Sequence, residues 1–233
     1  MSKYLLAALL CLSSITAFGT ARPEVKAAFK ANVQIHQQTI TENAYCSATA
    51  IGPQALLTAT HCELPTDDLE VSTLDQPVKI VGRIRDGYDH TIYLIDGGTF
   101  KDTAKVVQNG LELTDTVFIW GNPGEMNDMY RVGVFSGIHQ DQGFFGPTGP
   151  QEAMFQLPIF PGDSGAGIFA ENGTVVEVVS FTAQQQTKDG REISFAGAYA
   201  LSFKDEDLDR AAKFTTPQKD SHGDKSNTAT PNK

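Results

Sequence analysis

Short apolar runs alternate with clusters of Gly, Pro, Asn and Asp from about residue 33 to residue 203. Many short runs at this spacing are typical of an all-β sandwich or barrel. We predict strands over residues 33–38, 45–51, 55–60, 79–85, 90–95 and 105–108, and then over 116–120, 131–137, 153–157, 166–170, 175–181 and 193–201. The pattern therefore predicts an all-β fold class.

Two local signals refine this pattern. Asn172-Gly173 lies between two predicted strands and favours a hairpin with a type I′ turn, because both central residues of that turn need positive φ. Helical spacing is found only at residues 204–214, where Leu208, Ala211 and Ala212 form one apolar stripe. Residues 215–233 carry too little apolar surface to order themselves, so we expect a disordered tail there.

The first 21 residues have the pattern of a secretory signal peptide, with Lys3, an apolar run over residues 4–15 and then small residues. Cleavage after Gly19 or Ala21 fits this pattern. The run is shorter than the ~20 apolar residues that a membrane-spanning helix needs, so we expect no stable membrane anchor after signal removal. Cys46 and Cys62 then remain, and two cysteines in an exported protein favour a disulfide over a metal site.

Length and charge narrow the function classes. The 233 residues, 40% of them hydrophobic, suit one two-lobed domain or two small ones over residues 22–214. The formal net charge at pH 7 is −10, and a surface this negative repels phosphate backbones. We therefore expect no nucleic-acid partner, and we interpret the acidity as solubility outside the cell.

Two short strings carry the candidate chemistry. Thr58-Ala59-Thr60-His61-Cys62 places a histidine at the end of an apolar run, and Gly162-Asp163-Ser164-Gly165 places a serine between glycines. A serine hydroxyl is a poor nucleophile until a nearby base takes its proton, and a histidine can be that base. Backbone N–H groups of the glycine turn can bind the oxyanion that forms.

These strings resemble the trypsin-like serine proteases. The segment from Cys46 to Cys62 is similar to the family's histidine loop, and residues 161–166 are similar to its nucleophile turn. Spacings of 28 residues from His61 to Asp89 and 75 from Asp89 to Ser164 match the compact bacterial, HtrA-like branch of the family. We expect no PDZ domain in this chain. The resemblance covers about residues 33–214. It implies two perpendicular six-stranded β-barrels, a short C-terminal helix, no cofactor and a monomer.

The resemblance also implies residue roles. Ser164 would attack the scissile carbonyl, His61 would act as general base, and Asp89 would hold the imidazole. The N–H groups of Gly162 and Ser164 would form the oxyanion hole. Asp96 is the alternative to Asp89, but its odd offset along the same predicted strand places it on the opposite face.

A zinc site is the alternative use of His61, Cys62, Asp89 and His90. Adjacent residues on a strand point to opposite faces, so these four cannot easily converge on one ion. We therefore expect no metal.

The substrate pocket is implied by the same resemblance. Its walls would include Ser180, Phe181, Thr182 and Gly197, and Pro158 stands at its base, where trypsin carries an acid. Without a carboxylate a basic side chain would lose water and gain no partner, so we expect small or apolar residues before the cleaved bond.

One feature departs from the family pattern. No Ile-Val-Gly-Gly start is found near Val33, so either Asp163 has a partner other than a freed amine, or the enzyme is not activated by an N-terminal cut.

The sequence thus predicts an exported serine endopeptidase, secreted or periplasmic, that acts on protein or peptide substrates. Two alternatives remain at this stage. One is a catalytically inactive, protease-like binding protein. The other is an esterase that uses the same Ser-His-Asp residues.

Overall fold

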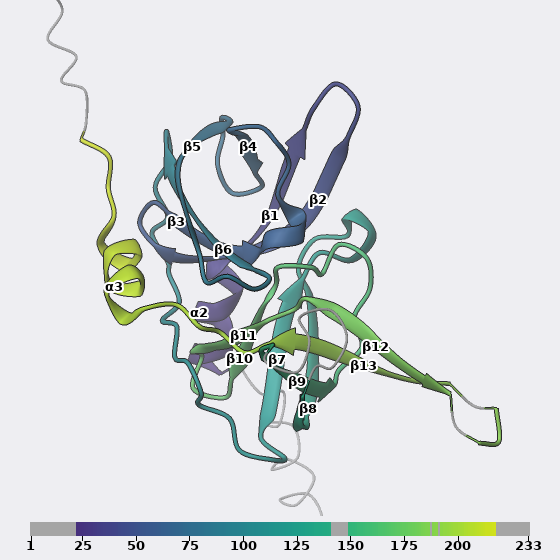
Figure 1. The fold of residues 1–233 in the computed structure, drawn as a ribbon. Coiled ribbons are helices and arrows are strands. Elements are labelled where there is room, and N and C mark those ends of the chain that lie inside the picture. The colour runs from purple at the N-terminus through teal and green to yellow at the C-terminus, as the bar shows by residue number, and fades with distance from the viewer. Residues whose placement is uncertain (1–21, 141–148, 187, 191, 218–233) are drawn as a thin grey trace, which may run out of the picture.

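The computed structural model describes residues 22–140, 149–186, 188–190 and 192–217. The predicted signal peptide and most of the predicted tail lie outside the described residues. The first lobe is a closed barrel with the strand order β1-β2-β3-β6-β5-β4 (Figure 1). Its strands are β1 (Asn32–Gln38), β2 (Asn43–Gly52), β3 (Ala55–Ala59), β4 (Asp68–Val71), β5 (Val78–Arg85) and β6 (His90–Asp96).

The second lobe is a seven-stranded sheet with the order β11-β10-β7-β8-β9-β13-β12. Its strands are β7 (Thr116–Gly121), β8 (Met129–Gln140), β9 (Gln151–Gln156), β10 (Gly167–Ala170), β11 (Val175–Val178), β12 (Phe181–Gln186) and β13 (Glu192–Tyr199). The predicted all-β class with two barrel-like sheets is confirmed. The second sheet holds one strand more than expected because β12, which begins where the expected run 175–181 ends, forms a separate strand.

Two α-helices flank the sheets within the described ranges, and only one of them was expected. The helix α3 (Asp205–Lys213) occupies the predicted position. The helix α2 (Pro23–Ala31) contradicts the expectation that only 204–214 is helical. It begins with Pro at its first turn, and Val25, Ala28 and Ala31 form its buried face. One valine and two alanines give this face too little apolar character for its spacing to stand out in the sequence.

Three further details differ from the sequence-based expectation. The strand β4 was not predicted, and the expected strand at 105–108 is only an isolated bridge between Val106 and Val175. The hairpin at Asn172-Gly173 forms, but only Gly173 of the pair has positive φ. Ala170 and Thr174 close a three-residue loop there, so the turn is not type I′.

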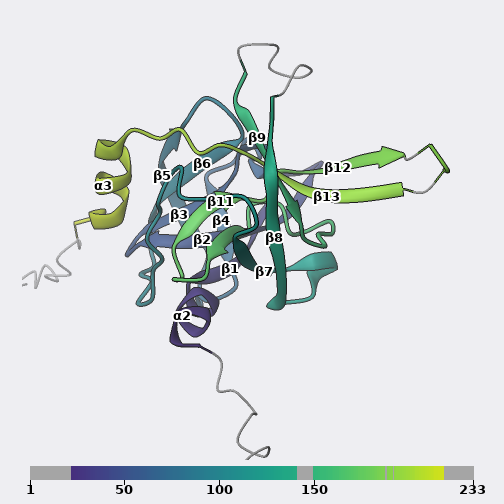
Figure 2. The same cartoon turned by 90° about the horizontal axis from the view of Figure 1, so that it is seen from below.

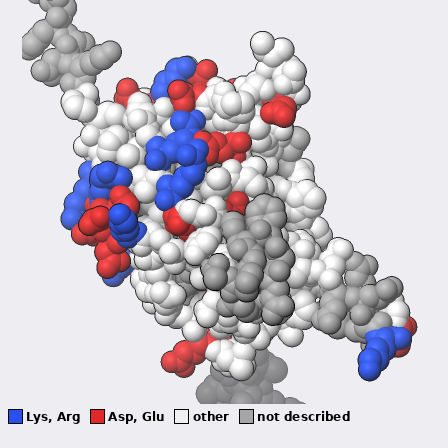
Figure 3. Space-filling model, in the orientation of Figure 1, with Lys and Arg blue, Asp and Glu red and all other residues white. Residues whose placement is uncertain are grey.

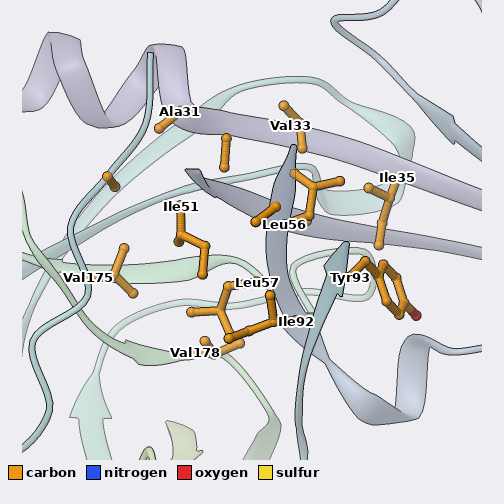
Figure 4. Close-up of a cluster of buried hydrophobic side chains, with 14 of the residues drawn as sticks. Ala31, Val33, Ile35, Ile51, Leu56, Leu57, Ile92, Tyr93, Val175 and Val178 are labelled. Atoms are coloured by element: carbon orange, nitrogen blue, oxygen red, sulfur yellow. The ribbon is translucent and has the colours of Figure 1, made fainter. Parts of the chain in front are cut away.

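The first-lobe core extends into the second lobe. Figure 4 shows Leu57 and Ile92 beside Val178 of β11, with Val175 in the same cluster, whereas Leu56 lies on the other face of β3. All five are 0% exposed. Truncation of a buried leucine to alanine typically costs about 2–5 kcal/mol of stability, so this shared core holds the two lobes against each other.

The C-terminal segment packs on the first barrel, where α3 lies beside it in Figures 1 and 2. A Cβ atom at Gly52 would collide with the carbonyl oxygen of Ala211 in α3. Beyond the helix, Thr216 donates a backbone hydrogen bond to Gln54, and its hydroxyl donates to Asp96 at 2.9 Å. The first residues of the expected tail, 215–217, therefore contact the barrel.

Charged side chains are unevenly distributed over the face drawn in Figure 3. Lys, Arg, Asp and Glu mix over the first barrel and α3, and the described surface over the second sheet is mostly uncharged. No helix among the described residues is long and apolar enough to span a membrane.

Candidate active site

His61 lies where β3 ends, within a 3₁₀ turn at Thr60–Cys62. Asp89 directly precedes β6, which pairs with β3, and the Thr60 N–H donates to the Asp89 carbonyl at 2.8 Å. The Asp89 carboxylate accepts hydrogen bonds from His61 Nδ1 at 2.8 Å and from the His61 backbone N–H at 2.9 Å. An ionised carboxylate can only accept, so Nδ1 carries the proton and Nε2 is left as a base.

The predicted disulfide is confirmed between Cys46 on β2 and Cys62, the residue after His61. Its two Cα atoms are 6.2 Å apart. His61 is thus fixed on one side by the disulfide and on the other by Asp89. Strand register and covalent linkage together set the place of the imidazole.

Ser164 lies in a turn whose peptide groups are nearly all hydrogen-bonded. Asp163 N–H donates to the Phe160 carbonyl at 3.0 Å, and Gly165 and Ala166 N–H donate to Val179 and Asp163 carbonyls, each at 2.9 Å. Between residues 160 and 166, the N–H groups of Gly162 and Ser164 are the two that find no acceptor among the described residues. They are the pair expected to bind an oxyanion.

Glycine is required at position 162. Its φ is +100°, and a Cβ atom there would collide with the carbonyl oxygen of Asn122. Gly165 is equally constrained, because its φ is +84° and a Cβ atom would collide with Ser47 and Thr58.

The turn also packs against the first barrel. The Ser47 N–H donates to the Ser164 carbonyl at 2.8 Å, and Gly165 lies against Ala59, two residues before His61. No hydrogen bond joins Ser164 to His61 within the part of the chain that the structure describes. In enzymes without substrate, such bonds are often long and shorten only in the reacting complex.

Asp163, which precedes the candidate nucleophile, is fully buried and paired with Arg131 of β8. Arg131 Nη1 and Nη2 each lie 2.6 Å from a carboxylate oxygen, which is the bidentate geometry of an Arg–carboxylate fork. Asp163 Oδ2 also accepts from the Phe160 N–H at 2.7 Å. Asp163 therefore has an internal cation as its partner, which answers the question that the missing Ile-Val-Gly-Gly start leaves open.

The alternatives to these residues are used differently. Asp96 lies at the end of β6, exposed, and accepts from Thr216. Among the described residues, no group of three or more His, Cys, Asp or Glu side chains is arranged to hold a metal ion.

A cavity of about 500 Å³ lies beside the turn that carries Ser164. Residues 156–160 line it, together with Thr182, Ser194 and Phe195, and none of these side chains is charged. Pro158 and Thr182 are therefore at the cavity, as the pocket assignment requires.

The other three predicted pocket residues are not among the lining side chains. The Phe181 ring covers Gly197, and the hydroxyl of Ser180 donates to the Val178 carbonyl at 3.3 Å.

Comparison with known proteins gives structural matches and no sequence matches. A scan against protein-family models found none, and neither did a comparison with curated proteins. The Rv3671c protease from M. tuberculosis in its active form superposes with a TM-score of 0.61 at 17% identity, covering 84% of this chain and 86% of that one.

The HtrA-type protease AlgW with a tripeptide gives a TM-score of 0.59 at 18% identity, covering 76% of this chain. This chain spans 58% of the AlgW chain. The chain has the trypsin-like fold. At 17–18% identity the structural similarity establishes the fold alone. The chemistry has to be argued from the geometry of this chain's own residues.

The supporting residues of the site were not found from the sequence. Arg131 begins one predicted strand and Ser47 lies inside another, and the sequence around them indicates no role for either. Both act across long sequence separations, on Asp163 and Gly162, and no local pattern marks such contacts. The one available signal was the buried aspartate before Ser164, which required a cation from somewhere in the chain.

Proposed function

We propose that this protein is a serine endopeptidase that uses Ser164, His61 and Asp89. The observation that carries the proposal is the turn at residues 160–166. The two N–H groups that the resemblance assigns to an oxyanion hole are the two in this turn that find no acceptor in the part of the chain the structure describes, and Asp89 orients the base. Together they supply a nucleophile, a base and an oxyanion site.

The reaction follows from these positions. His61 Nε2 takes the hydroxyl proton of Ser164 as the oxygen attacks the peptide carbonyl. The tetrahedral oxyanion binds to the N–H groups of Gly162 and Ser164. The imidazolium, stabilised by Asp89, then protonates the leaving amine, and water hydrolyses the acyl-enzyme by the reverse sequence.

The uncharged cavity beside Phe160 is the proposed site for the side chain before the cleaved bond. A Lys or Arg side chain would be desolvated there without an anionic partner. Small or apolar side chains such as Ala, Val or Leu fit it better. Differences among these should be modest, because one methylene group is worth about 1–3 kcal/mol in such a pocket.

The Arg131–Asp163 pair bears on activation. Because Arg131 supplies the cation that Asp163 needs, the turn does not depend on a newly freed N-terminal amine. We infer that cleavage of the predicted signal peptide is the only processing that the protein requires. The Cys46–Cys62 disulfide supports an oxidising, extracytoplasmic location.

Two assays separate the proposal from its alternatives. Purified mature protein should cleave casein, and Ser164→Ala should not, although its circular dichroism and melting temperature should match the wild type. Folded wild-type protein that cleaves no casein and no member of a peptide library would favour the binding protein. Hydrolysis of small esters without any peptide cleavage would favour the esterase.

A further inference from the structure

A single buried hydroxyl of the first lobe holds the carbonyl of Gly162. Ser47 is on β2, directly after the disulfide cysteine Cys46, and is 0% exposed. Its Oγ donates to the Gly162 carbonyl at 2.9 Å. It accepts from Asn122 twice, from the backbone N–H at 3.1 Å and from Nδ2 at 2.9 Å.

These three hydrogen bonds use the full capacity of the hydroxyl. A serine Oγ has one proton to donate and two lone pairs to accept with. Because Asn122 occupies both lone pairs, the proton is directed to the Gly162 carbonyl. Asn122 is itself fixed, since its Oδ1 accepts from the Asp128 N–H at 3.2 Å.

The carbonyls on both sides of the Gly162 amide are therefore held. Ser47 holds the Gly162 carbonyl, and the Gly124 N–H holds the Pro161 carbonyl at 2.8 Å. The described chain has no cis peptide bond, so the N–H of Gly162 points away from the Pro161 carbonyl. The Gly162 N–H belongs to the Pro161–Gly162 peptide group, which Gly124 holds, and Ser47 holds the following group, Gly162–Asp163, so both backbone dihedral angles of this glycine are restrained.

We propose that Ser47 and Asn122 are positioning residues that keep the Gly162 N–H directed into the oxyanion hole. This inference rests on the proposed function. Neither side chain contacts the reacting atoms. Their effect is to prepare the donor before substrate binds, which matters because a preformed oxyanion site costs no reorganisation during the reaction.

The test compares two hydroxyl deletions on the same strand. Thr49 is also 0% exposed, and its Oγ1 accepts from the Gly167 N–H at 3.1 Å, beyond the turn. Ser47→Ala and Thr49→Val each remove one buried hydroxyl, and Ser47→Ala should lower the melting temperature more because it leaves three hydrogen-bonding groups without a partner against one. Ser47→Ala should also lower kcat about 10- to 100-fold with KM little changed, somewhat less than the loss of a direct donor. Thr49→Val should keep kcat near the wild-type value.

A transition-state readout makes the test specific. The affinity for a peptide boronate, whose tetrahedral adduct occupies the oxyanion hole, should fall with Ser47→Ala in parallel with kcat. The pH dependence of kcat/KM should not move, because His61 and Asp89 are untouched.

Asn122→Asp provides a second variant of nearly the same size, in which the Nδ2 group that donates to Ser47 and to the Val33 carbonyl becomes an acceptor. Its carboxylate would accept the Ser47 proton and release the Gly162 carbonyl, so kcat should fall as it does in Ser47→Ala. In the double variant Ser47→Ala/Asn122→Asp, the two losses should be less than additive.

Equal kcat losses for Ser47→Ala and Thr49→Val, or unchanged boronate affinity in Ser47→Ala, would overturn this inference while leaving the peptidase intact. Wild-type protein without any peptidase activity would instead reject the proposed function.

Discussion

The two lobes position their halves of the site by different means. In the closed first barrel, the pairing of β3 with β6 places His61 and Asp89. A disulfide between two cysteines 16 residues apart in sequence fixes the residue after His61. In the second lobe, Ser164 lies on a turn held by Ser47, Gly124 and Arg131, which come from distant parts of the chain. The base is thus held within the first lobe, and the nucleophile turn depends on contacts from both lobes.

This contrast has a consequence for sensitivity to mutation. A change at His61 or Asp89 should affect the chemistry of the base directly. A change among the anchors of the turn should affect folding and the oxyanion site together. The following variants separate these two kinds of effect.

The largest effect is expected at the carboxylate that orients the base. Asp89→Asn should leave the fold intact and lower kcat/KM about 10⁴-fold, because an amide can hold the imidazole in the wrong tautomer. Steady-state kinetics with a peptide substrate measures this loss. Asp96→Asn is the matched control on β6, and it should have little effect. A large loss in the control together with a small one in Asp89→Asn would reverse the assignment.

The next largest effect is expected at Arg131, the buried cation of the second lobe. Arg131→Ala leaves the Asp163 carboxylate buried without its partner, which typically costs about 3–5 kcal/mol of stability. Arg131→Lys keeps the charge but loses the two-pronged geometry, and it should be intermediate. Urea unfolding measures both, with Arg210→Ala on the exposed face of α3 as a control that changes stability little. A stable, fully active Arg131→Ala protein would contradict the role given to this pair.

The disulfide of the first lobe should contribute somewhat less. Replacing both Cys46 and Cys62 with serine should lower the free energy of unfolding by about 3 kcal/mol, the chain-entropy value for a loop of this length. Activity at temperatures where the variant is folded should fall only modestly, because Asp89 still holds His61. Comparing kcat at 15 °C with the unfolding midpoint separates the two effects. Complete loss of activity in folded protein would show that the disulfide alone sets the imidazole.

The smallest effect is expected at Glu177, a buried carboxylic acid on β11. Burial raises the pKa of Glu177 well above its usual value, with nearby Asp86 adding to the rise, while a hydrogen bond from Leu201 N–H opposes it. The folded state therefore binds this proton more tightly than the unfolded state does. Its stabilising effect is complete below the unfolded pKa near 4.5 and is lost as pH rises toward the folded pKa.

Glu177→Gln tests this linkage because an amide can still accept from Leu201 and does not titrate. Its stability relative to the wild type should increase as pH rises from 4.5 to neutrality, measured by denaturant unfolding at several pH values. A constant difference between the two proteins across that range would contradict the linkage.

The same contrast explains what the sequence could and could not predict. The run at residues 55–59 and the Cys-flanked His61 are local patterns, and both predict the first lobe well. The helix α2 was missed because its apolar face consists of Val25 and two alanines over nine residues. The strand β12 (Phe181–Gln186) is not apparent from the pattern because most of its residues are polar and it begins only at the last residue of the expected run 175–181. Partners such as Arg131 and Ser47 are set only by three-dimensional packing, and no spacing in the sequence encodes them.

The central claim is that Ser164 is an activated nucleophile, and covalent labelling tests it most directly. Folded wild-type protein treated with a fluorophosphonate probe should carry one adduct, which peptide mass mapping places on Ser164, and His61→Ala should react far more slowly. A protein that stays unlabelled while folded, or an adduct on another residue, would contradict the account.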